Sequence, residues 1–314
     1  MPSQLILICG PTATGKTRLG VALAKALGGE VVSADSMQVY RDLVIGTARP
    51  TQEEMAGVPH HMMGVADPRE NYSVARYVQE ATACVEDIFR RGRQPIVVGG
   101  TGLYLDALCQ GRSFSDFRPE TGVRTRLQAQ AAQGGLDALW EQLRQVDPET
   151  AARLHPHDAK RIIRALEVWY DTGQTISQHN RQTQTQPPRY QGVTIALTYR
   201  DRQDLYQRID QRVDQMMARG LAEEVRALLA AGIPRTSTAM QAIGYKEFAA
   251  ALRGEETLSD AVAAVKLRSR QYAKRQRTWF RRNRDTNWIF WEKSPDLAAA
   301  RQKATAFLED FGLS

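Results

Sequence analysis

The sequence predicts an α/β fold: a parallel sheet core flanked by helices, with an inserted helical domain. In the first 111 residues, short apolar runs typical of buried strands alternate with amphipathic segments typical of helices. From about Arg112 the strand-like runs stop, and they resume only after a polar, proline-ended stretch at residues 182–188. We therefore predict a core made of residues 1–111 and 190–314 and a helical insertion made of residues 112–189.

The strongest motif lies close to the N-terminus. An apolar run at residues 5–9 leads into a loop that fits G-x-x-x-x-G-K-[ST], and an amphipathic helix follows at residues 17–27. This is the strand–loop–helix context of a P-loop NTPase-like core. The N–H groups of the loop would bind phosphate, Lys16 would reach the terminal phosphate, and the Thr17 hydroxyl would hold Mg²⁺. The predicted phosphate-binding residues are Gly10, Pro11, Thr12, Ala13, Thr14, Gly15, Lys16 and Thr17.

Two further strands are predicted to end beside this loop. Residues 30–34 form an apolar run that ends at Asp35, and residues 95–98 run into a glycine-rich turn. Ligands of parallel sheets bind beyond the carboxyl ends of the strands, so we expect Asp35 and the turn to face the phosphate site. His60 and His61 lie in a turn-rich stretch, where we interpret them as solvated or hydrogen-bonded side chains rather than metal ligands.

Periodicity predicts the remaining elements. Helices are expected at residues 73–91, 103–109, 122–133, 136–145, 148–154, 159–171, 202–219, 221–231, 239–252, 258–282 and 296–311, and strands at residues 192–198 and 288–291. Arg208 and Arg212 are one turn apart in the helix at residues 202–219, where either could clamp a phosphate group.

Positive charge is concentrated in one predicted helix. Residues 266–284 contain nine basic residues and no acidic one, so without this segment the formal net charge of +7 would become negative. Arg270, Lys274, Arg277 and Arg281 follow a helical spacing and form a stripe that should point outward, whereas Val265, Tyr272 and Trp279 would form the packed face. Because no acidic residue alternates with the stripe, we interpret it as a contact surface for a phosphate backbone.

The amino-acid composition limits the class of protein and its cellular compartment. The hydrophobic content of 42% and the charged content of 25% are ordinary for a globular chain, and no apolar run is long enough to span a bilayer. The N-terminus enters a core strand at once, which predicts no signal peptide. The three scattered cysteines suit a reducing compartment, so we expect a cytoplasmic protein.

Three function classes fit these features. A small-molecule kinase would use the loop, Asp35 and a helical lid, and a nucleic-acid group transferase would also use the basic helix. A nucleotide-regulated RNA-binding module without chemistry is the third. The basic stripe discriminates against the kinase, and Asp35 beside the phosphate site discriminates against pure binding.

The ordered set of motifs resembles the bacterial tRNA dimethylallyltransferase family (tRNA isopentenyltransferases) nearly end to end. Besides the phosphate loop it comprises Asp-Ser-Met-Gln-Val-Tyr (35–40), Ile-Gly-Thr-Ala-Arg-Pro (45–50), Val-Gly-Gly-Thr-Gly-Leu-Tyr (98–104), Ala-Ile-Gly-Tyr-Lys (242–246) and Lys-Arg-Gln-x-Thr-Trp-Phe (274–280). The resemblance implies transfer of a dimethylallyl group from dimethylallyl diphosphate to N6 of the adenosine 3′ of the anticodon, in tRNAs reading codons that begin with U. It also implies Mg²⁺, a monomer and a mobile helical domain. Adenylate isopentenyltransferases, near relatives that act on free nucleotides, are the alternative that the basic helix opposes.

The resemblance also implies roles for particular residues. Asp35 would be the base on the adenine amine, acting with Thr17 and Thr101, and Arg208 or Arg212 would bind the diphosphate. Ser36, Met37 and Gln38 would line the pocket of the flipped base, with Gln38 as the reader of its edge. Thr101 and Val123 would approach the tRNA, as would three stretches that consist of Ala159, Lys160, Arg161, Ile162 and Ile163; of Met240, Gln241, Ala242, Ile243, Gly244 and Tyr245; and of Ala273, Lys274, Arg275, Gln276, Arg277, Thr278, Trp279 and Phe280.

Overall fold

The computed structural model describes residues 4–111, 121–184 and 187–313. The chain divides into two compact units: Met1–Gly111 with Arg189–Ser314, and Arg112–Pro188. We call the first the α/β unit and the second the helical unit. Among the described residues, no helix combines the length and the apolar character that crossing a bilayer requires.

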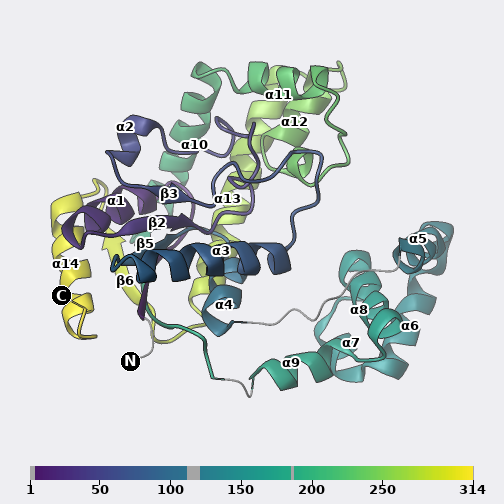
Figure 1. The fold of residues 1–314 in the computed structure, drawn as a ribbon. Coiled ribbons are helices and arrows are strands. Elements are labelled where there is room, and N and C mark those ends of the chain that lie inside the picture. The colour runs from purple at the N-terminus through teal and green to yellow at the C-terminus, as the bar shows by residue number, and fades with distance from the viewer. Residues whose placement is uncertain (1–3, 112–120, 185–186, 314) are drawn as a thin grey trace. The chain divides into compact units, whose positions relative to one another are not determined.

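The α/β unit is built on a six-stranded sheet in the order β3-β2-β4-β1-β5-β6, and every strand pair in it is parallel (Figure 1). This confirms the predicted fold class. The strands are β1 (Gln4–Cys9), β2 (Glu30–Ser33), β3 (His60–His61), β4 (Pro95–Val98), β5 (Gln191–Tyr199) and β6 (Asn287–Trp291).

Helices cover both faces of the sheet. Successive side chains at residues 5–9 of β1 point to opposite faces and are all apolar, so both faces need to be covered. Leu5 and Leu7 join one apolar cluster with residues of α3 (Val74–Arg90), α4 (Gly102–Gln110), α11 (Leu221–Ala230), α12 (Tyr245–Ala251) and α13 (Leu258–Phe280). Ile6 and Ile8 point the other way, into a cluster with residues of α1 (Lys16–Ala26), α10 (Arg202–Ala218) and α14 (Leu297–Glu309). Because both faces are buried, the central strands are continuously apolar rather than alternating.

The helical unit has its own apolar core. It contains α5 (Thr121–Gln130), a kink at Ala131–Gly135 where Gly134 has a φ of 83°, α6 (Leu136–Val146), α7 (Pro148–Arg153), α8 (Ala159–Thr172) and α9 (Ile176–Gln184). Leu139, Leu143, Ile162 and Leu166 are fully buried in its centre. The Asp147 carboxylate caps the start of α7 through the N–H of Thr150 and also accepts from the N–H of Ser177, which ties α9 to the unit.

The structure differs from the sequence predictions at several elements. Helix α2 (Gln52–Met55) and helix α9 were not predicted. His60 and His61 form the short edge strand β3 instead of a turn. The helix predicted at residues 239–252 is a 3₁₀ turn at Ala239–Gln241 followed by α12, because Gly244 has a φ of 99° and breaks the helix. Helix α9 extends to Gln184, into the stretch predicted to be a linker, of which residues 185–186 lie outside the described residues.

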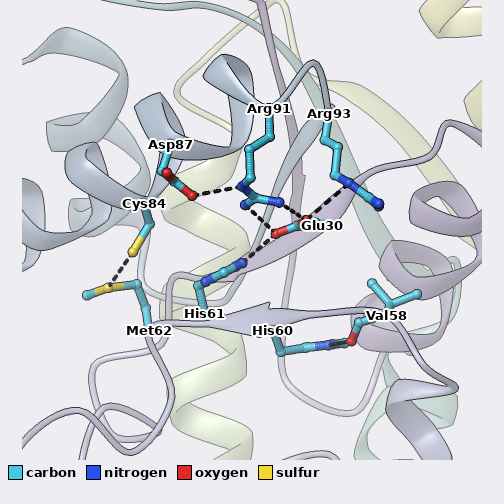
Figure 2. A network of polar contacts seen from close by, with 9 residues as sticks. All are labelled: Glu30, Val58, His60, His61, Met62, Cys84, Asp87, Arg91 and Arg93. Atoms are coloured by element: carbon cyan, nitrogen blue, oxygen red, sulfur yellow. Dashed lines mark hydrogen bonds and ion pairs between the residues drawn. The ribbon is translucent and has the colours of Figure 1, made fainter.

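A buried carboxylate at the start of β2 binds side chains of the edge strand β3 and of the chain after α3. It lies at the end of β2 that is opposite Asp35. Glu30, at the start of β2, is bound by the Arg91 guanidinium, by His61 Nε2 at 2.7 Å and by Arg93 Nε at 3.5 Å (Figure 2). The bond from Arg91 is the main cause that lowers the pKa of Glu30 from 4.5 to about 2. His60 makes a separate bond to the carbonyl oxygen of Val58, so both histidines are hydrogen-bonded.

This network predicts an acid-sensitive contribution to stability. Because the pKa of Glu30 is depressed in the folded state, its contribution is complete above about pH 4.5 and is lost as the pH falls toward 2. Glu30→Gln should lower the free energy of unfolding by roughly 1–3 kcal/mol at neutral pH, and should make stability less steeply dependent on pH in this window. Urea unfolding at a series of pH values measures both effects. The matched control is Glu292→Gln, which alters an exposed pair with Arg200 and should change neither.

Candidate active site

The phosphate loop adopts the backbone that its glycines permit. Gly10 and Gly15 have φ values of 127° and 80°, and Ala13 also has a positive φ, of 63°. The Thr14 hydroxyl donates to the carbonyl oxygen of Pro11 at 2.9 Å, and Trp291 Nε1 donates to that of Thr14 at 2.8 Å. The conformation of the loop is therefore fixed by its own hydrogen bonds and by a bond from β6. The loop leads directly into the N-terminus of α1, and a helix N-terminus is a favourable place for an anion.

Lys16 and Arg212 bring two cations to this loop. Lys16 Nζ donates to the carbonyl oxygen of Pro11 at 2.7 Å, and burial, followed by the nearby Arg212, lowers its pKa to about 8. Arg212 Nη1 donates to Thr12 Oγ1 at 3.2 Å, and burial lowers its pKa as well. Arg208, the alternative clamp, donates instead to Gln211 at 3.4 Å. These contacts favour Arg212 as the cation beside the loop.

Asp35 follows β2 and starts a tight turn. Its Oδ1 accepts the N–H groups of Met37 at 2.9 Å and Gln38 at 3.3 Å, which fixes the carboxylate. The Thr101 hydroxyl oxygen accepts the N–H of Ser36 at 3.0 Å and so joins the second glycine turn to this one. Gln38 donates to the carbonyl oxygen of Thr47 at 3.2 Å and accepts from Ser33 Oγ at 3.2 Å.

Two cavities in the α/β unit meet at these residues. The larger, of about 1020 Å³, is lined by the phosphate loop, Lys16, Thr17 and Arg208. The smaller, of about 320 Å³, is lined by Ser36 and by apolar side chains that include Met37, Ile209 and Val213. Both cavities are lined by Thr12, Asp35, Thr47, Arg212, Met216 and Tyr272. Tyr272 therefore belongs to the site, where burial raises its pKa to about 12, although its sequence spacing suggested the packed face of the basic helix.

Gln276 connects the basic helix to the phosphate loop. It is 6% exposed, its Oε1 accepts the N–H of Thr12 at 3.0 Å, and its Nε2 donates to the carbonyl oxygen of Gly100 at 3.0 Å. Sequence reasoning placed Gln276 only among residues that approach tRNA. A signal for this bridge is its helical spacing from the buried Ala273 and Phe280, which puts a polar side chain on the packed face of α13.

The basic stripe is partly neutralised, which corrects the prediction that all four of its cations point outward. Arg270 is bound to Asp210 of α10 at 2.7 Å, and outside the stripe Lys266 pairs with Asp214 and Arg268 with Glu247. These acids come from neighbouring helices, so the absence of acidic residues within the segment 266–284 did not reveal them. Lys274 and Arg281 are exposed and Arg277 is partly exposed, as predicted.

Many side chains in the predicted tRNA-binding stretches are buried. Ile162 and Ile163 are buried inside the helical unit. The buried residues of the predicted stretches in the α/β unit are Met240, Ala242, Tyr245, Ala273, Gln276 and Phe280, and all eight side chains are 8% exposed or less. Ala242, Ile243, Gly244, Tyr245 and Gln241 line the smaller cavity. Lys160 and Arg161 of α8 are exposed, whereas Val123 of α5 is partly buried. The buried side chains of the predicted tRNA-binding stretches therefore pack beneath the surface, and only their exposed neighbours are accessible to a partner.

The chain has close relatives of known class. Residues 38–283 match the family model described as IPP transferase, and residues 3–64 match one described as isopentenyl transferase. The tRNA dimethylallyltransferase of Caldanaerobacter subterraneus subsp. tengcongensis is 47% identical over 291 residues, which cover 92% of each chain.

Two solved structures are also similar. The full-length tRNA isopentenylpyrophosphate transferase of Bacillus halodurans is 42% identical with a TM-score of 0.73, covering 99% of this chain and 98% of that one. A eukaryotic dimethylallyltransferase acting on tRNA is 33% identical with a TM-score of 0.81, covering 98% of this chain and 79% of the other. Because the IPP transferase model spans most of the chain and the bacterial relatives match it almost throughout, this chain belongs to the IPP transferase family, a family of transferases that includes the tRNA dimethylallyltransferases.

Proposed function

We propose that the protein transfers a dimethylallyl group from dimethylallyl diphosphate to N6 of the adenosine 3′-adjacent to the anticodon, in tRNAs reading codons that begin with U. The observation that carries this proposal is the position of Asp35, which lines both the cavity of the phosphate loop and the smaller cavity beside it. A carboxylate at this junction can face an acceptor amine while the leaving group departs on the phosphate side. The names of the relatives support the same reaction class.

The donor would bind through its diphosphate to residues Thr12 to Thr17, with Lys16 and Arg212 as the clamping cations. Arg208 lines the same cavity and would take a secondary part. Both clamping cations are partly desolvated, as their lowered pKa values indicate, so an anion bound between them is held strongly. Their positive charge would stabilise the negative charge that develops on the departing diphosphate.

The acceptor base would enter the smaller cavity, lined by Ser36 and Met37, where the Thr101 hydroxyl binds the N–H of Ser36. Gln38 lines the larger cavity, which meets the smaller one at Asp35 and Thr47, and would reach the base from there. An adenine amine is a weak nucleophile because its lone pair is delocalised into the ring, so a positioned base is needed. N6 would form the new bond to the allylic carbon as the carbon–oxygen bond to diphosphate breaks. Asp35 would accept the proton that N6 loses, and the electron pair of the broken bond would leave with the diphosphate.

Thr17 is the residue that would hold Mg²⁺, together with oxygens of the donor diphosphate. Among the described residues no group of three or more His, Cys, Asp or Glu side chains could hold a metal ion. A hydroxyl in the phosphate cavity nevertheless fits magnesium, which commonly takes one or two protein ligands and completes its shell with phosphate oxygens and water. When bound, the ion would neutralise charge on the leaving group.

The enzyme would act as a monomer in the cytoplasm. Its tRNA substrate would contact α13. Lys274, Arg277 and Arg281 would bind its phosphate backbone, and Lys160 and Arg161 would do so from the helical unit. The base is stacked in free tRNA and must be flipped out, which costs a few kcal/mol. Phosphate contacts distant from the reaction would offset this cost.

The test of the proposed function is a direct transfer assay. The purified protein is incubated with unmodified tRNA, dimethylallyl diphosphate and Mg²⁺, and the tRNA is then digested and analysed by mass spectrometry. The expected result is the mass increment of one dimethylallyl group on the adenosine 3′ of the anticodon. If free adenosine monophosphate were modified instead of tRNA, the acceptor assignment would be wrong.

Asp35→Asn should lower kcat by roughly 10²–10⁴-fold, because it removes the base. The Asn side-chain oxygen can still accept the N–H groups of Met37 and Gln38, so the turn should keep its shape. Affinity for tRNA, which depends mainly on phosphate contacts, should change little. Single-turnover transfer and tRNA binding measured together test this, and near-normal transfer by the variant would show that Asp35 positions the base without taking its proton.

Replacing Lys274, Arg277 and Arg281 together by Gln should weaken tRNA binding. The slope of log affinity against log salt should become shallower by up to about one for each phosphate group that the variant no longer binds. The KM for dimethylallyl diphosphate should stay the same. Arg301→Gln, on α14, is the matched control for removal of an exposed charge. An unchanged salt slope in the triple variant would mean that these side chains do not bind the phosphate backbone.

Binding of the donor should also depend on the protonation of Lys16. Its pKa of about 8 without ligand means that it is charged below pH 8 and progressively neutral above it, so donor affinity should fall by up to tenfold per pH unit above 8. Lys16→Arg keeps the charge at every pH tested and should give a shallower fall. Calorimetric titration with dimethylallyl diphosphate between pH 7 and 9.5 measures both slopes, and equal slopes would refute the role of Lys16.

A further inference from the structure

Glu224 of α11 holds an unusual set of hydrogen bonds outside the two cavities. Its Oε2 accepts the N–H groups of Val44 at 3.1 Å and Ile45 at 2.8 Å, and its Oε1 accepts the N–H of Gly46 at 3.1 Å. The Tyr245 hydroxyl donates to Oε1 at 2.6 Å. Four donors therefore converge on one carboxylate, which uses both oxygens twice.

The three N–H groups belong to consecutive residues, so residues 44–46 are wrapped around the carboxylate. Successive N–H groups that point to one place form a concave anion-binding nest, and bonds to an ionised acceptor are stronger than neutral ones. Gly46 also lies against Tyr245, because a Cβ there would be 2.5 Å from the ring. Glu224 and Tyr245 therefore help to hold the shape of this loop, in addition to the bonds that Thr47 Oγ1 donates to the carbonyl oxygens of Leu43 and Val44.

The other side of the same loop faces the acceptor cavity. Gly46 and Thr47 line that cavity together with Asp35, Ser36 and Met37. Gln38 Nε2 donates to the carbonyl oxygens of Thr47 at 3.2 Å and Ala48 at 3.5 Å, so the loop orients the Gln38 amide. Gln38 lines the larger cavity, which shares Asp35 and Thr47 with the acceptor cavity, so a displacement of residues 44–48 would move an amide at the junction of the two.

We propose that Glu224 is a positioning residue for acceptor selection: it shapes loop 44–48 and, through it, holds the Gln38 amide against the edge of the target adenine. This inference rests on the proposed function. Glu224 touches no reacting atom. Its effect should appear in how the enzyme recognises the base and should leave the binding of dimethylallyl diphosphate unchanged, because the phosphate loop is held by other contacts.

The test uses anticodon stem-loops in which the target is adenosine, 1-deazaadenosine or 7-deazaadenosine. Each analogue keeps the N6 amine but lacks one ring nitrogen that an amide can contact. For the wild type we expect kcat/KM to fall by roughly 5- to 150-fold for one of the two analogues, the range for removing a bidentate amide–adenine pair. In Gln38→Ala this penalty should nearly vanish, and in Glu224→Gln it should shrink at least fivefold while the KM for dimethylallyl diphosphate changes less than twofold.

Glu224→Gln replaces one acceptor oxygen by an NH₂ group that cannot accept the N–H groups of the loop. Amide hydrogen exchange should therefore become faster at Val44, Ile45 and Gly46 but not in the phosphate loop. Glu223→Gln, on the neighbouring exposed residue, is the matched control and should resemble the wild type. Tyr245→Phe removes one donor only, and should give a smaller change in the same direction even if Glu224→Gln folds poorly.

The outcomes separate the two proposals. A wild type that modifies no stem-loop contradicts the proposed function. A wild type that transfers normally, but is indifferent to both analogues, overturns the role of Gln38 and with it that of Glu224. A Glu224→Gln variant that keeps the full penalty, or that raises the KM for dimethylallyl diphosphate as much as that for the stem-loop, shows that Glu224 has only a structural role.

Discussion

Close backbone contact at the carboxyl end of the sheet is the constraint on which the site depends. A Cβ on Gly10 would lie 2.2 Å from the carbonyl oxygen of Leu197, and one on Gly99 would lie 2.1 Å from that of Ala34. No side chain fits at either distance, so glycine allows the phosphate loop to rest on β5 and the second glycine turn to rest on β2. The two turns and the end of β2 are thereby drawn together, and Asp35 comes to line the same cavity as the loop. A larger residue at either glycine would separate them.

Electrostatics distinguishes the site from the rest of the α/β unit. Elsewhere, arginines near carboxylates form ion pairs, such as Arg91 with Glu30 and Arg268 with Glu247. At the phosphate loop, by contrast, Lys16 and Arg212 donate to neutral oxygens of Pro11 and Thr12, and Arg212 contributes to the lowered pKa of Lys16. Two desolvated cations held close together repel each other, and the nearby carboxylate of Asp35 offsets this only in part, because the pKa of both cations is still lowered. A polyanionic ligand such as a diphosphate removes this disadvantage, which explains why the site can tolerate the arrangement and why it would select such ligands.

Much of this arrangement could be predicted from local sequence. The phosphate loop, the position of Asp35 at a strand end and most helix spans follow from motifs and periodicity that act over a few residues. What could not be predicted depends on tertiary contacts. The pairing of Arg270 with Asp210 joins two helices that are distant in sequence, and the spacing of Arg208 and Arg212 on one helix gave no reason to choose between them. Strand β3 has only two residues, and it is a strand because it pairs with β2. The apolar pattern predicted one continuous helix at residues 239–252, but Gly244 interrupts it.

The two carboxylates near the acceptor cavity differ in how their oxygens are used, and this difference suggests a division of roles. Glu224 accepts four hydrogen bonds across both oxygens, so taking a proton would require breaking bonds that shape the loop at residues 44–46. The backbone bonds to Asp35 both end on Oδ1, which orients the carboxylate and needs no change when the group gains a proton at its other oxygen. If the proposed function holds, the site must both recognise a base and deprotonate it, and the two carboxylates would separate these tasks. Glu224 would maintain the shape of the cavity, and Asp35 would accept the proton without disturbing that shape.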